Sequence, residues 1–404
     1  MSATTAAVPD AWQLPAQEHA AKVLYQAVSR GDVGHAWAFT GPRGVGQQDA
    51  ARRLAAALNC VDPPSDGVPC GACSVCDRCR RGAFGAYYEF VPSGTEHRAD
   101  DVRNTWLEAA YGSLMEGRWK VLRVVDADRM NVTAANALLK GLEEPPARTV
   151  WILDITDPEP LPDTIMSRCR DLAFARWSLV DLERYAADCG VGDVTDARLA
   201  ARLADGSPAA LDRYAESGTL TRGSGKRKEE TAWSGMAFLR EHRAIPGRLR
   251  DQGQGFALRA AYAVDQHEIA CRTAALKERH ATELVKLDDD FAGEVPVRVR
   301  KLTEDRHKRA EREAKLATVR GTLDDLVSWY RDGLFIAAGG DPEHALHSDA
   351  VDQLRADADA LGSAGMLRAI DLIWQTADDL DRNVQVRLAL EALFLDLAVL
   401  TMRR

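Results

Sequence analysis

The sequence lacks any long apolar run. No stretch of its 404 residues approaches the roughly 20 consecutive apolar residues that a membrane-spanning helix needs. The first residues, Met-Ser-Ala-Thr-Thr-Ala-Ala-Val, also lack the basic region and apolar block of a signal peptide. We therefore expect a cytoplasmic protein with no membrane partner.

The sequence also lacks an excess of basic residues, because 52 Lys and Arg stand against 61 Asp and Glu, for a formal net charge of −9. Non-specific binding along DNA phosphates needs a basic surface, so we do not expect it to be the dominant activity, although a local basic patch is compatible with this charge. Single hydrophobic cores seldom grow beyond about 250 residues, so the length predicts two or three domains.

A glycine-rich turn lacks the two side chains that nucleotide hydrolysis needs. A short apolar strand pattern at 36–40 leads into it and an alanine-rich helix pattern at about 47–58 follows, which is the layout that cradles a phosphate. The motif requires a Lys for the β- and γ-phosphates and a Ser or Thr for Mg²⁺, but this chain has two glutamines. We expect a vestigial nucleotide site at which ATP binding is doubtful. Its residues would be Gly41, Gly44, Gly46, Gln47 and Gln48.

A second departure follows the apolar run 119–125. P-loop ATPases place an Asp at such a point to hold Mg²⁺, followed by a Glu that activates water. Here the pair is Asp126-Ala127, so the water-activating carboxylate is missing. Asp126 is compatible with a residual metal role and equally with an ion pair to Arg129 at the end of a strand.

Strand and helix patterns alternate through this half of the chain. Apolar, β-rich runs at 87–91 and 149–155 flank the run already described, and helical patterns cover 99–112 and 131–144. Alternation of this kind predicts a parallel sheet with helices on both faces.

Five of the eight cysteines lie within twenty residues, at 60–79. In a reducing cytoplasm such a cluster indicates metal ligation rather than disulfides. Tetrahedral Zn²⁺ binds four thiolates at about 2.3 Å, and a closed four-sulfur site is structural. We favour Cys60, Cys70, Cys73 and Cys76 as zinc ligands with Cys79 spare; the alternative is a group of unmetallated thiols.

Several further motifs lie between about residue 20 and the last helix. With the cysteine knuckle, they are His35-Ala36, Asp126-Ala-Asp-Arg129, the block 134–146 containing Leu-Leu-Lys-Gly-Leu-Glu-Glu-Pro-Pro, Ser167-Arg168-Cys169 and Asn383–Glu391. Together they resemble the clamp-loader AAA+ proteins of bacterial DNA polymerase III, and the last of them looks like that family's collar motif.

The resemblance implies an order of domains. It implies an α/β AAA+ core at 1–176 with the zinc insert at 60–79, a small helical lid domain at 177–220, a linker at 221–230 and an all-α collar domain for oligomerisation at 231–404. The residue pattern from Thr231 onward also predicts helices without strands. The basic run Lys226-Arg227-Lys228 is either a solvated hinge or a DNA contact.

The resemblance also implies roles for two polar residues. Arg168 matches the family's arginine finger, which reaches into the ATP site of a neighbouring subunit in trans; the alternative is an ion pair with Asp163 or Asp171. Thr156 matches a nucleotide-sensing position beside the phosphate site, and without nucleotide it would cap its strand.

The missing Lys and Glu indicate which type of clamp-loader subunit the chain resembles. In these departures the chain resembles the family's delta-prime subunits, which do not hydrolyse ATP and act as a stator. Their implied partners are the ATPase subunits and delta, with the sliding clamp and primed DNA reached through the complex. The glutamine pair makes it a divergent example, so a specialised paralogue stays open. Two alternative functions are an active AAA+ ATPase and a stand-alone zinc-containing DNA-binding protein.

Overall fold

A computed structural model of the chain describes residues 8–92, 96–159, 161–222, 229–291, 293–295, 297–382 and 384–402. The chain forms two compact units, one made of residues 1–181 with 206–209 and the other of 182–205 with 210–404. Among the helices of the described segments, none is long and apolar enough to span a membrane.

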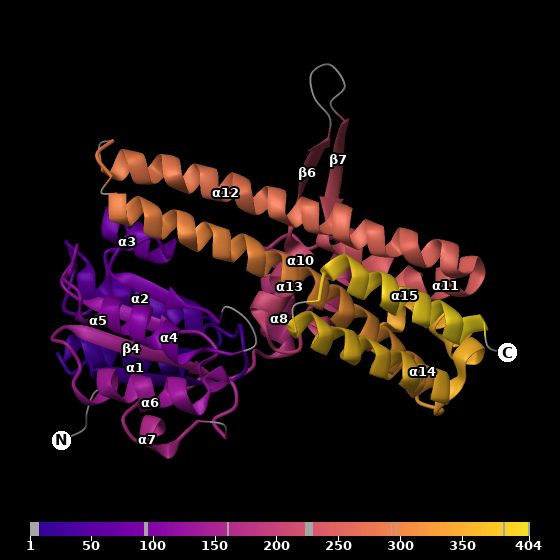
Figure 1. Cartoon of the computed structure of the whole chain (residues 1–404), viewed down its shortest axis with the longest axis horizontal. Coiled ribbons are helices and arrows are strands. Elements are labelled where there is room, and N and C mark those ends of the chain that lie inside the picture. The colour runs from indigo at the N-terminus through magenta and orange to yellow at the C-terminus, as the bar shows by residue number, and fades with distance from the viewer. Residues whose placement is uncertain are drawn as a thin grey trace. The chain divides into compact units, whose positions relative to one another are not determined.

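The first unit contains a five-stranded parallel sheet in the order β2-β3-β4-β1-β5 (Figure 1). Its strands are β1 (Ala36–Thr40), β2 (Tyr87–Phe90), β3 (Lys120–Val124), β4 (Thr149–Ile155) and β5 (Arg170–Ala173). The sheet and helices confirm the predicted α/β core. β5 was not predicted, because three of its four residues are exposed and its sequence carries no apolar run.

Helices cover both faces of this sheet, and β1 shows why. Trp37 and Phe39 face the cluster formed with α1 (Glu18–Ser29) and α2 (Gln47–Asn59), whereas Ala36 and Ala38 face the cluster formed with α6 (Val132–Glu143) and its neighbours. Figure 1 shows α2 and α6 on opposite sides of the sheet. Since side chains alternate along a strand, a strand covered on both faces is apolar throughout.

Shorter helices complete the first unit. They are the 3₁₀ turns η1 (Asp10–Trp12) and η3 (Ala127–Arg129), α3 (Ser74–Arg80), α4 (Ala99–Asp101), the π-helix η2 (Val102–Trp106), α5 (Leu107–Tyr111) and α7 (Asp163–Met166). The helix predicted at 99–112 therefore forms with a π-turn at its centre. The helix predicted at 131–144 begins one residue later, because the Asn131 side chain accepts a hydrogen bond from the Ala134 N–H at 2.9 Å and caps it.

The later part of the chain is mainly helical. Its helices are α8 (Leu179–Asp188), α9 (Val194–Leu203), α10 (Pro208–Ala215), α11 (Gly235–Ala263), the π-helix η4 (Val264–Glu268), α12 (Ile269–Asp290), α13 (Val297–Ala337), the 3₁₀ turns η5 (Pro342–His344) and η6 (Ser348–Ala350), α14 (Val351–Asp381) and α15 (Val386–Met402). A large all-helical C-terminal region was predicted and is confirmed.

Two strands correct the expected linker. β6 (Ser217–Arg222) and β7 (Glu229–Ser234) pair as an antiparallel hairpin, so neither a linker from 221 nor helices from Thr231 describes these residues. The hairpin is anchored by Trp233, which packs on Phe238 with ring centroids 5.7 Å apart. The basic run at 226–228 lies outside the described residues.

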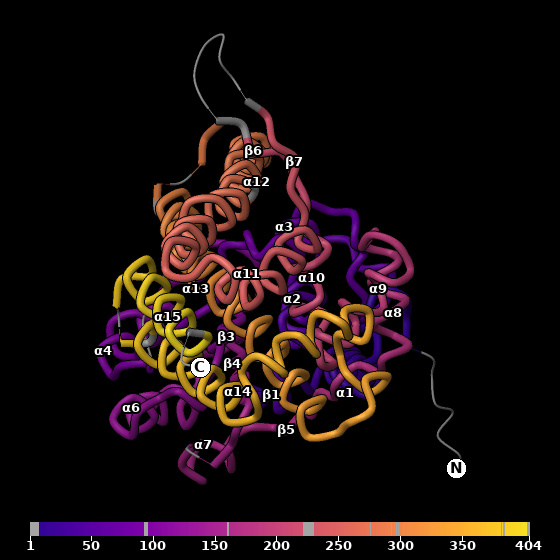
Figure 2. Tube along the Cα trace, turned by 90° about the vertical axis from the view of Figure 1, so that its right-hand side faces the viewer, coloured from indigo at the N-terminus to yellow at the C-terminus, as the bar shows by residue number. Residues whose placement is uncertain are grey.

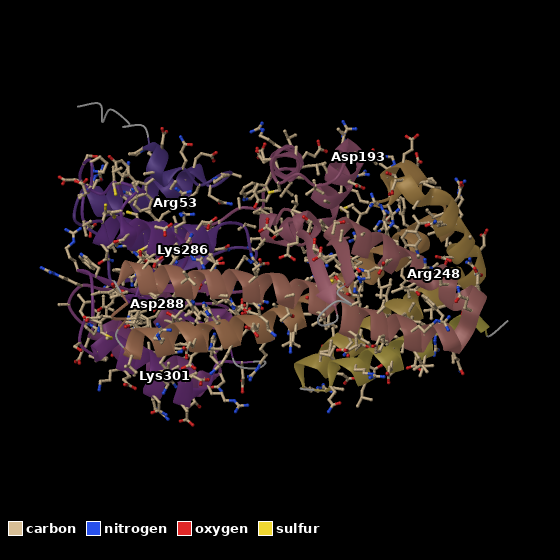
Figure 3. The ribbon with its side chains drawn as sticks, turned by 90° about the horizontal axis from the view of Figure 1, so that it is seen from above. Arg53, Asp193, Arg248, Lys286, Asp288 and Lys301 are labelled. Atoms are coloured by element: carbon tan, nitrogen blue, oxygen red, sulfur yellow. The ribbon has the colours of Figure 1, made fainter. Side chains whose placement is uncertain are left out.

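The core of the second unit lies among α11, α13, α14 and α15, which pack against one another (Figure 2). Along α13, Val319, Leu323, Leu326 and Tyr330 recur at helical spacing and are buried. The first half of α13 packs on α12, and Lys286, Asp288 and Lys301 mark the charged surface of this pair of helices (Figure 3).

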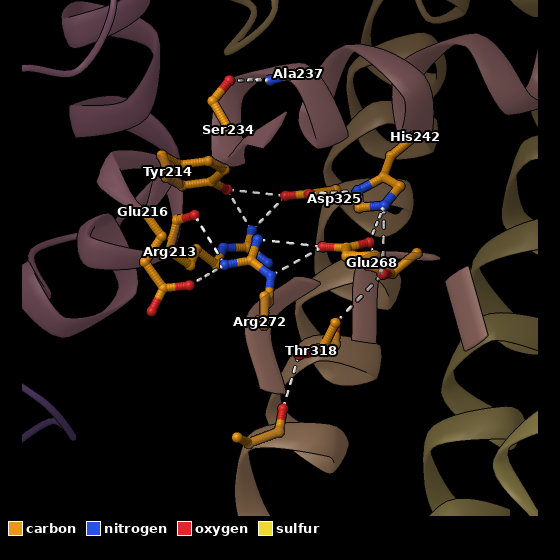
Figure 4. Close-up of polar contacts among 12 residues, drawn as sticks. Arg213, Tyr214, Glu216, Ser234, Ala237, His242, Glu268, Arg272, Thr318 and Asp325 are labelled. Atoms are coloured by element: carbon orange, nitrogen blue, oxygen red, sulfur yellow. Dashed lines mark hydrogen bonds and ion pairs between the residues drawn. The ribbon is translucent and has the colours of Figure 1, made fainter. Parts of the chain in front are cut away.

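A buried polar network lies under α11 in the same unit (Figure 4). His242 Nδ1 lies 2.9 Å from Asp325 and Nε2 lies 2.9 Å from Glu268, which also accepts a hydrogen bond from Arg272 at 3.2 Å. Tyr214 donates to Asp325 at 2.8 Å. Burial alone would lower the pKa of His242, but the two carboxylates outweigh it and raise that pKa to about 9.

Candidate functional site

The candidate site lies where parallel strands of the first unit end. The glycine loop at 41–46 follows β1, Asp126 is the second residue after β3, and Thr156 follows β4 directly. The carboxyl ends of parallel strands meet at one edge of a sheet, which is where ligands bind in open α/β folds. The Gly41 N–H donates to the Ile155 carbonyl at 3.0 Å, so Thr156, which is exposed, lies beside the start of the loop.

The loop is held tightly from outside. The Gly44 carbonyl accepts hydrogen bonds from the Ser207 hydroxyl at 3.3 Å and from the Ala209 N–H at 3.2 Å. The Val45 carbonyl accepts from the Gln17 amide at 3.1 Å and from the Trp177 indole N–H at 2.9 Å. The loop therefore has a fixed shape, because its carbonyls are bound to segments before and after the sheet.

Close packing requires glycine at the start of the loop. Gly41 has φ +140°, and a Cβ there would lie 2.2 Å from the Phe174 carbonyl oxygen. No other residue fits this backbone position without moving the chain.

Gln47 closes the loop on itself. Its side-chain amide donates to the Pro42 carbonyl at 2.6 Å, and its side-chain oxygen accepts a hydrogen bond from the Val45 N–H at 3.2 Å. The side chain is buried, with 4% of the residue exposed. Backbone N–H groups of such a loop cradle a phosphate in nucleotide-binding proteins. Here the Val45 N–H is bound to the protein's own glutamine instead.

The neighbouring Gln48 side chain points elsewhere. It is exposed and donates to Glu89 Oε1 on β2 at 3.1 Å. Neither glutamine supplies the charge of the Lys that the motif usually has.

Asp126 is held by two arginines. Arg43, within the glycine loop, places its Nε 2.8 Å from Asp126 Oδ1, and Arg129 Nη1 lies 3.9 Å from Oδ2. Burial raises the pKa of Asp126, while the two arginines oppose that shift. The predicted ion pair to Arg129 is present, but the closer partner, Arg43, was not predicted.

Sequence reasoning missed a buried charge cluster next to the loop. Arg123 on β3 donates to Asp154 on β4 at 2.9 Å and also pairs with Glu89. Burial raises the pKa of Asp154 to about 6, whereas Arg123 and Arg52 outweigh burial at Glu89 and lower its pKa to about 2. The available signal was a single charged residue interrupting each of two otherwise apolar strands, in Val-Leu-Arg-Val and Ile-Leu-Asp-Ile.

Arg168 lies between α7 and β5, apart from the glycine loop. Its Nη2 lies 2.6 Å from Glu143 Oε1 at the end of α6, and its Nη1 donates to the Thr164 carbonyl at 2.8 Å. The side chain is 34% exposed. The predicted alternative partners Asp163 and Asp171 are replaced by Glu143, and Asp171 accepts a hydrogen bond from Thr40 instead.

The structure brings four predicted cysteines together. The Sγ atoms of Cys60, Cys70, Cys73 and Cys76 all lie within 4.8 Å of one another, and Cys79 is buried outside the group. Cys60 ends α2 and Cys73 caps α3, so helix ends position the thiols.

The donor set suits a metal ion. The Cys70 and Cys76 sulfurs lie 3.9 Å apart. Four thiolates about 2.3 Å from one tetrahedral ion would be about 3.8 Å apart. Backbone N–H groups of Cys70, Cys73 and Cys76 donate to Cys60, Cys70 and Cys73 sulfurs at 3.3–3.4 Å. Such hydrogen bonds stabilise thiolates, so the residues present fit a tetrahedral metal site.

Comparison with known proteins covers mainly the first unit. Residues 16–178 match the family described as DNA polymerase III, delta subunit. This segment is similar to that family's domain. The tau subunit of Salmonella typhimurium is 37% identical over 155 residues, 38% of this chain and 23% of that protein. The tau subunit of Bacillus subtilis is 34% identical over 160 residues, 40% of this chain and 28% of that protein.

The delta-like domain is therefore homologous to subunits of DNA polymerase III, and the chain spans about a quarter of the length of these curated relatives. The solved structures found to be similar include a gamma subunit-related protein of Thermotoga maritima, with 15% identity over 95% of this chain and 99% of that one and a TM-score of 0.44. The clamp loader delta protein of Bacillus subtilis has 11% identity over 93% and 99%, with a TM-score of 0.32.

Proposed function

We propose that the chain is a delta-prime-type stator of a bacterial replicative clamp loader, which helps load the sliding clamp onto primed DNA without hydrolysing ATP itself. One observation carries the proposal: Gln47 fills the glycine loop, and Arg43 within that loop neutralises Asp126. The Val45 N–H is bound to Gln47 and the Asp126 carboxylate is paired with Arg43. Neither group is therefore free to bind a phosphate or its Mg²⁺. The homology to tau supports a place among clamp-loader subunits.

In this proposal Arg168 acts on the ATP site of a neighbouring ATPase subunit. A guanidinium is permanently charged and forked, so it stabilises charge on a transferring phosphoryl group, an effect worth about 10³–10⁵ in rate in related systems. Its partner Glu143 is half exposed, and an exposed ion pair is worth only about 0–1 kcal/mol. Arg168 can therefore exchange Glu143 for a phosphate at little cost.

The C-terminal region supports a collar role for residues 231–404. Leu367 and Trp374 on α14 and Leu388 on α15 are 50%, 59% and 57% exposed, although the same helices also carry the buried side chains of Leu354, Ile373 and Phe394. Exposed large apolar side chains on packed helices favour contacts with other subunits. The lid domain at 177–220 is proposed on the same family resemblance.

The finger proposal is tested in the assembled complex. Arg168→Ala, purified and mixed with the ATPase subunits, delta, clamp and primed DNA, should lower clamp-stimulated ATP turnover at least about tenfold, while the isolated chain shows no ATPase activity. Arg103→Ala is a matched control, because Arg103 is exposed and pairs only loosely with Asp100 at 3.9 Å. Turnover equal to that of the control would reject the finger, and ATPase activity of the isolated chain would reject the stator.

Zinc is the proposed metal of the cysteine group, bound by Cys60, Cys70, Cys73 and Cys76 as a structural ion. Purified protein should contain about one zinc per chain, and Cys70→Ser should lose it and unfold its first unit more easily, because structural zinc contributes folding energy. Cys189→Ser is the control, since Cys189 is exposed and outside the group. A folded wild-type protein without metal would contradict the proposal.

A further inference from the structure

A cavity of about 190 Å³ lies in the second unit, apart from the site described above. It is enclosed by the two halves of α11 and by η4. Its apolar walls include Phe238, Ile245, Phe256 and Val264, all of which are buried. Exposed residues such as Arg248 also line it, so it opens at the surface.

The backbone creates this space. α11 is interrupted at Gly253, whose φ of 60° and ψ of −149° are not helical, and lining residues come from both sides of that break. The π-helix η4 forms another wall. π-turns widen a helix locally and occur often at functional sites. The cavity is therefore a product of two irregular backbone segments.

The floor of the cavity favours an apolar group. His242 lines it, but both ring nitrogens are already bound, one to Asp325 and one to Glu268 (Figure 4). The floor thus offers no free imidazole donor, and the Glu268 carboxylate is itself bound to His242 and Arg272. An apolar side chain of a ligand fits inside, and any negative charge on that ligand must stay outside.

The rim favours negative charge. Three of the five arginines of α11 pair with carboxylates, in Arg240–Asp196, Arg243–Asp349 and Arg250–Asp357. Arg248 and Arg259, which line the cavity, have no carboxylate partner among the described residues. Each guanidinium instead lies 5.8 Å from the Phe256 ring centre. Glu241 is also on the rim, which leaves one net positive charge there.

We propose that this cavity binds an acidic peptide segment of a protein partner, which inserts one aromatic or large aliphatic side chain and pairs flanking carboxylates with Arg248 and Arg259. The size agrees, because an apolar cavity of about 150 Å³ binds benzene, whereas pockets for larger ligands begin at about 300 Å³. A nucleic-acid base would leave its polar edge unpaired against these walls. This inference does not depend on the proposed function of the first unit.

The test uses the full chain and a fluorescence-polarisation titration. The probes are labelled peptides with Phe, Trp, Leu or Ala at the centre and three Asp or Glu on each side. At least one apolar-centred peptide should bind at least about tenfold more tightly than the Ala-centred peptide, a difference of about 1.4 kcal/mol. The double variant Arg248→Ala/Arg259→Ala should weaken that binding at least about tenfold. Arg279→Ala, an exposed arginine on α12, should not.

A second variant separates blocking from unfolding. Ala263 is exposed and lines the cavity, so Ala263→Trp narrows the mouth without changing the core. It should weaken peptide binding while the thermal midpoint stays that of the wild type. Equal binding of the Ala-centred peptide, or unchanged binding by Ala263→Trp, would overturn the proposal. So would N-acetylphenylalanine binding as tightly as the peptide, or a single-stranded oligonucleotide displacing it.

Discussion

Replacing Gln47 by Ala tests whether the glycine loop is closed by its own side chain. The substitution removes the hydrogen bond to the Pro42 carbonyl and leaves the Val45 N–H without its acceptor. The first loss costs about 1 kcal/mol and an unpaired buried N–H costs about 1–3 kcal/mol. We therefore expect the free energy of unfolding to fall by about 2–4 kcal/mol.

The measurement is thermal unfolding followed by tryptophan fluorescence. For a unit of this size, 1 kcal/mol corresponds to about 2–4 °C, so the midpoint should fall by about 5–15 °C. Gln48→Ala is the matched control, because its exposed side chain makes one bond to Glu89 and its loss should cost less than about 1 kcal/mol. If Gln47→Ala and Gln48→Ala have the same thermal midpoint, the argument that Gln47 fills the loop is refuted.

The vacated loop provides a second readout from the same variant. With the Val45 N–H released, pyrophosphate should stabilise Gln47→Ala more than wild type, and a ligand at ten times its dissociation constant adds about 1.4 kcal/mol. Equal stabilisation of both proteins would mean that the glutamine does not occupy the phosphate position.

Two further predictions concern pH and backbone fit. His242 has a folded-state pKa of about 9, above the unfolded value of about 6.5, so its stabilisation is complete below pH 6.5 and is lost as pH rises through 9. Between pH 6 and 9.5 the free energy of unfolding, measured by urea titration, should fall by roughly 3 kcal/mol more in wild type than in His242→Gln. An equal fall in both proteins would contradict the ion-paired histidine. Gly41→Ala should unfold or misfold the first unit, because its Cβ would lie 2.2 Å from the Phe174 carbonyl oxygen. Gly71→Ala, with open space around it, should cost only about 1 kcal/mol. Equal losses of stability in circular dichroism melts would show that the clash at Gly41 is relieved.

The sequence was sufficient wherever a pattern is periodic or local. β1 and β4 were placed to the residue, because strands buried on both faces are apolar throughout and are bounded by turn residues. The four cysteines were grouped correctly; Cys-x2-Cys spacing brings Cys70, Cys73 and Cys76 together, although the same spacing continues to Cys79, which lies outside the group.

The features that the sequence did not reveal depend on long-range packing. The β6–β7 hairpin was missed because its strands are short and polar and are held by Trp233 against a helix. The pairing of Arg123 with Asp154 joins two strands whose neighbouring register cannot be read from either one. The direction of the Gln47 side chain is set by the loop backbone. The sequence motif therefore shows that the lysine is missing, but not that the glutamine side chain turns back to bind the loop.

The partners of the glycine loop have a consequence for folding during synthesis. Gly44 and Val45 are synthesised early, but Trp177, Ser207 and Ala209 follow 132 to about 165 residues later. At 5–20 residues per second the ribosome needs roughly 7–33 s to deliver them. Until then the Gly44 carbonyl lacks its protein donors and the Val45 carbonyl has only Gln17, so the sheet can form before the loop takes its final shape.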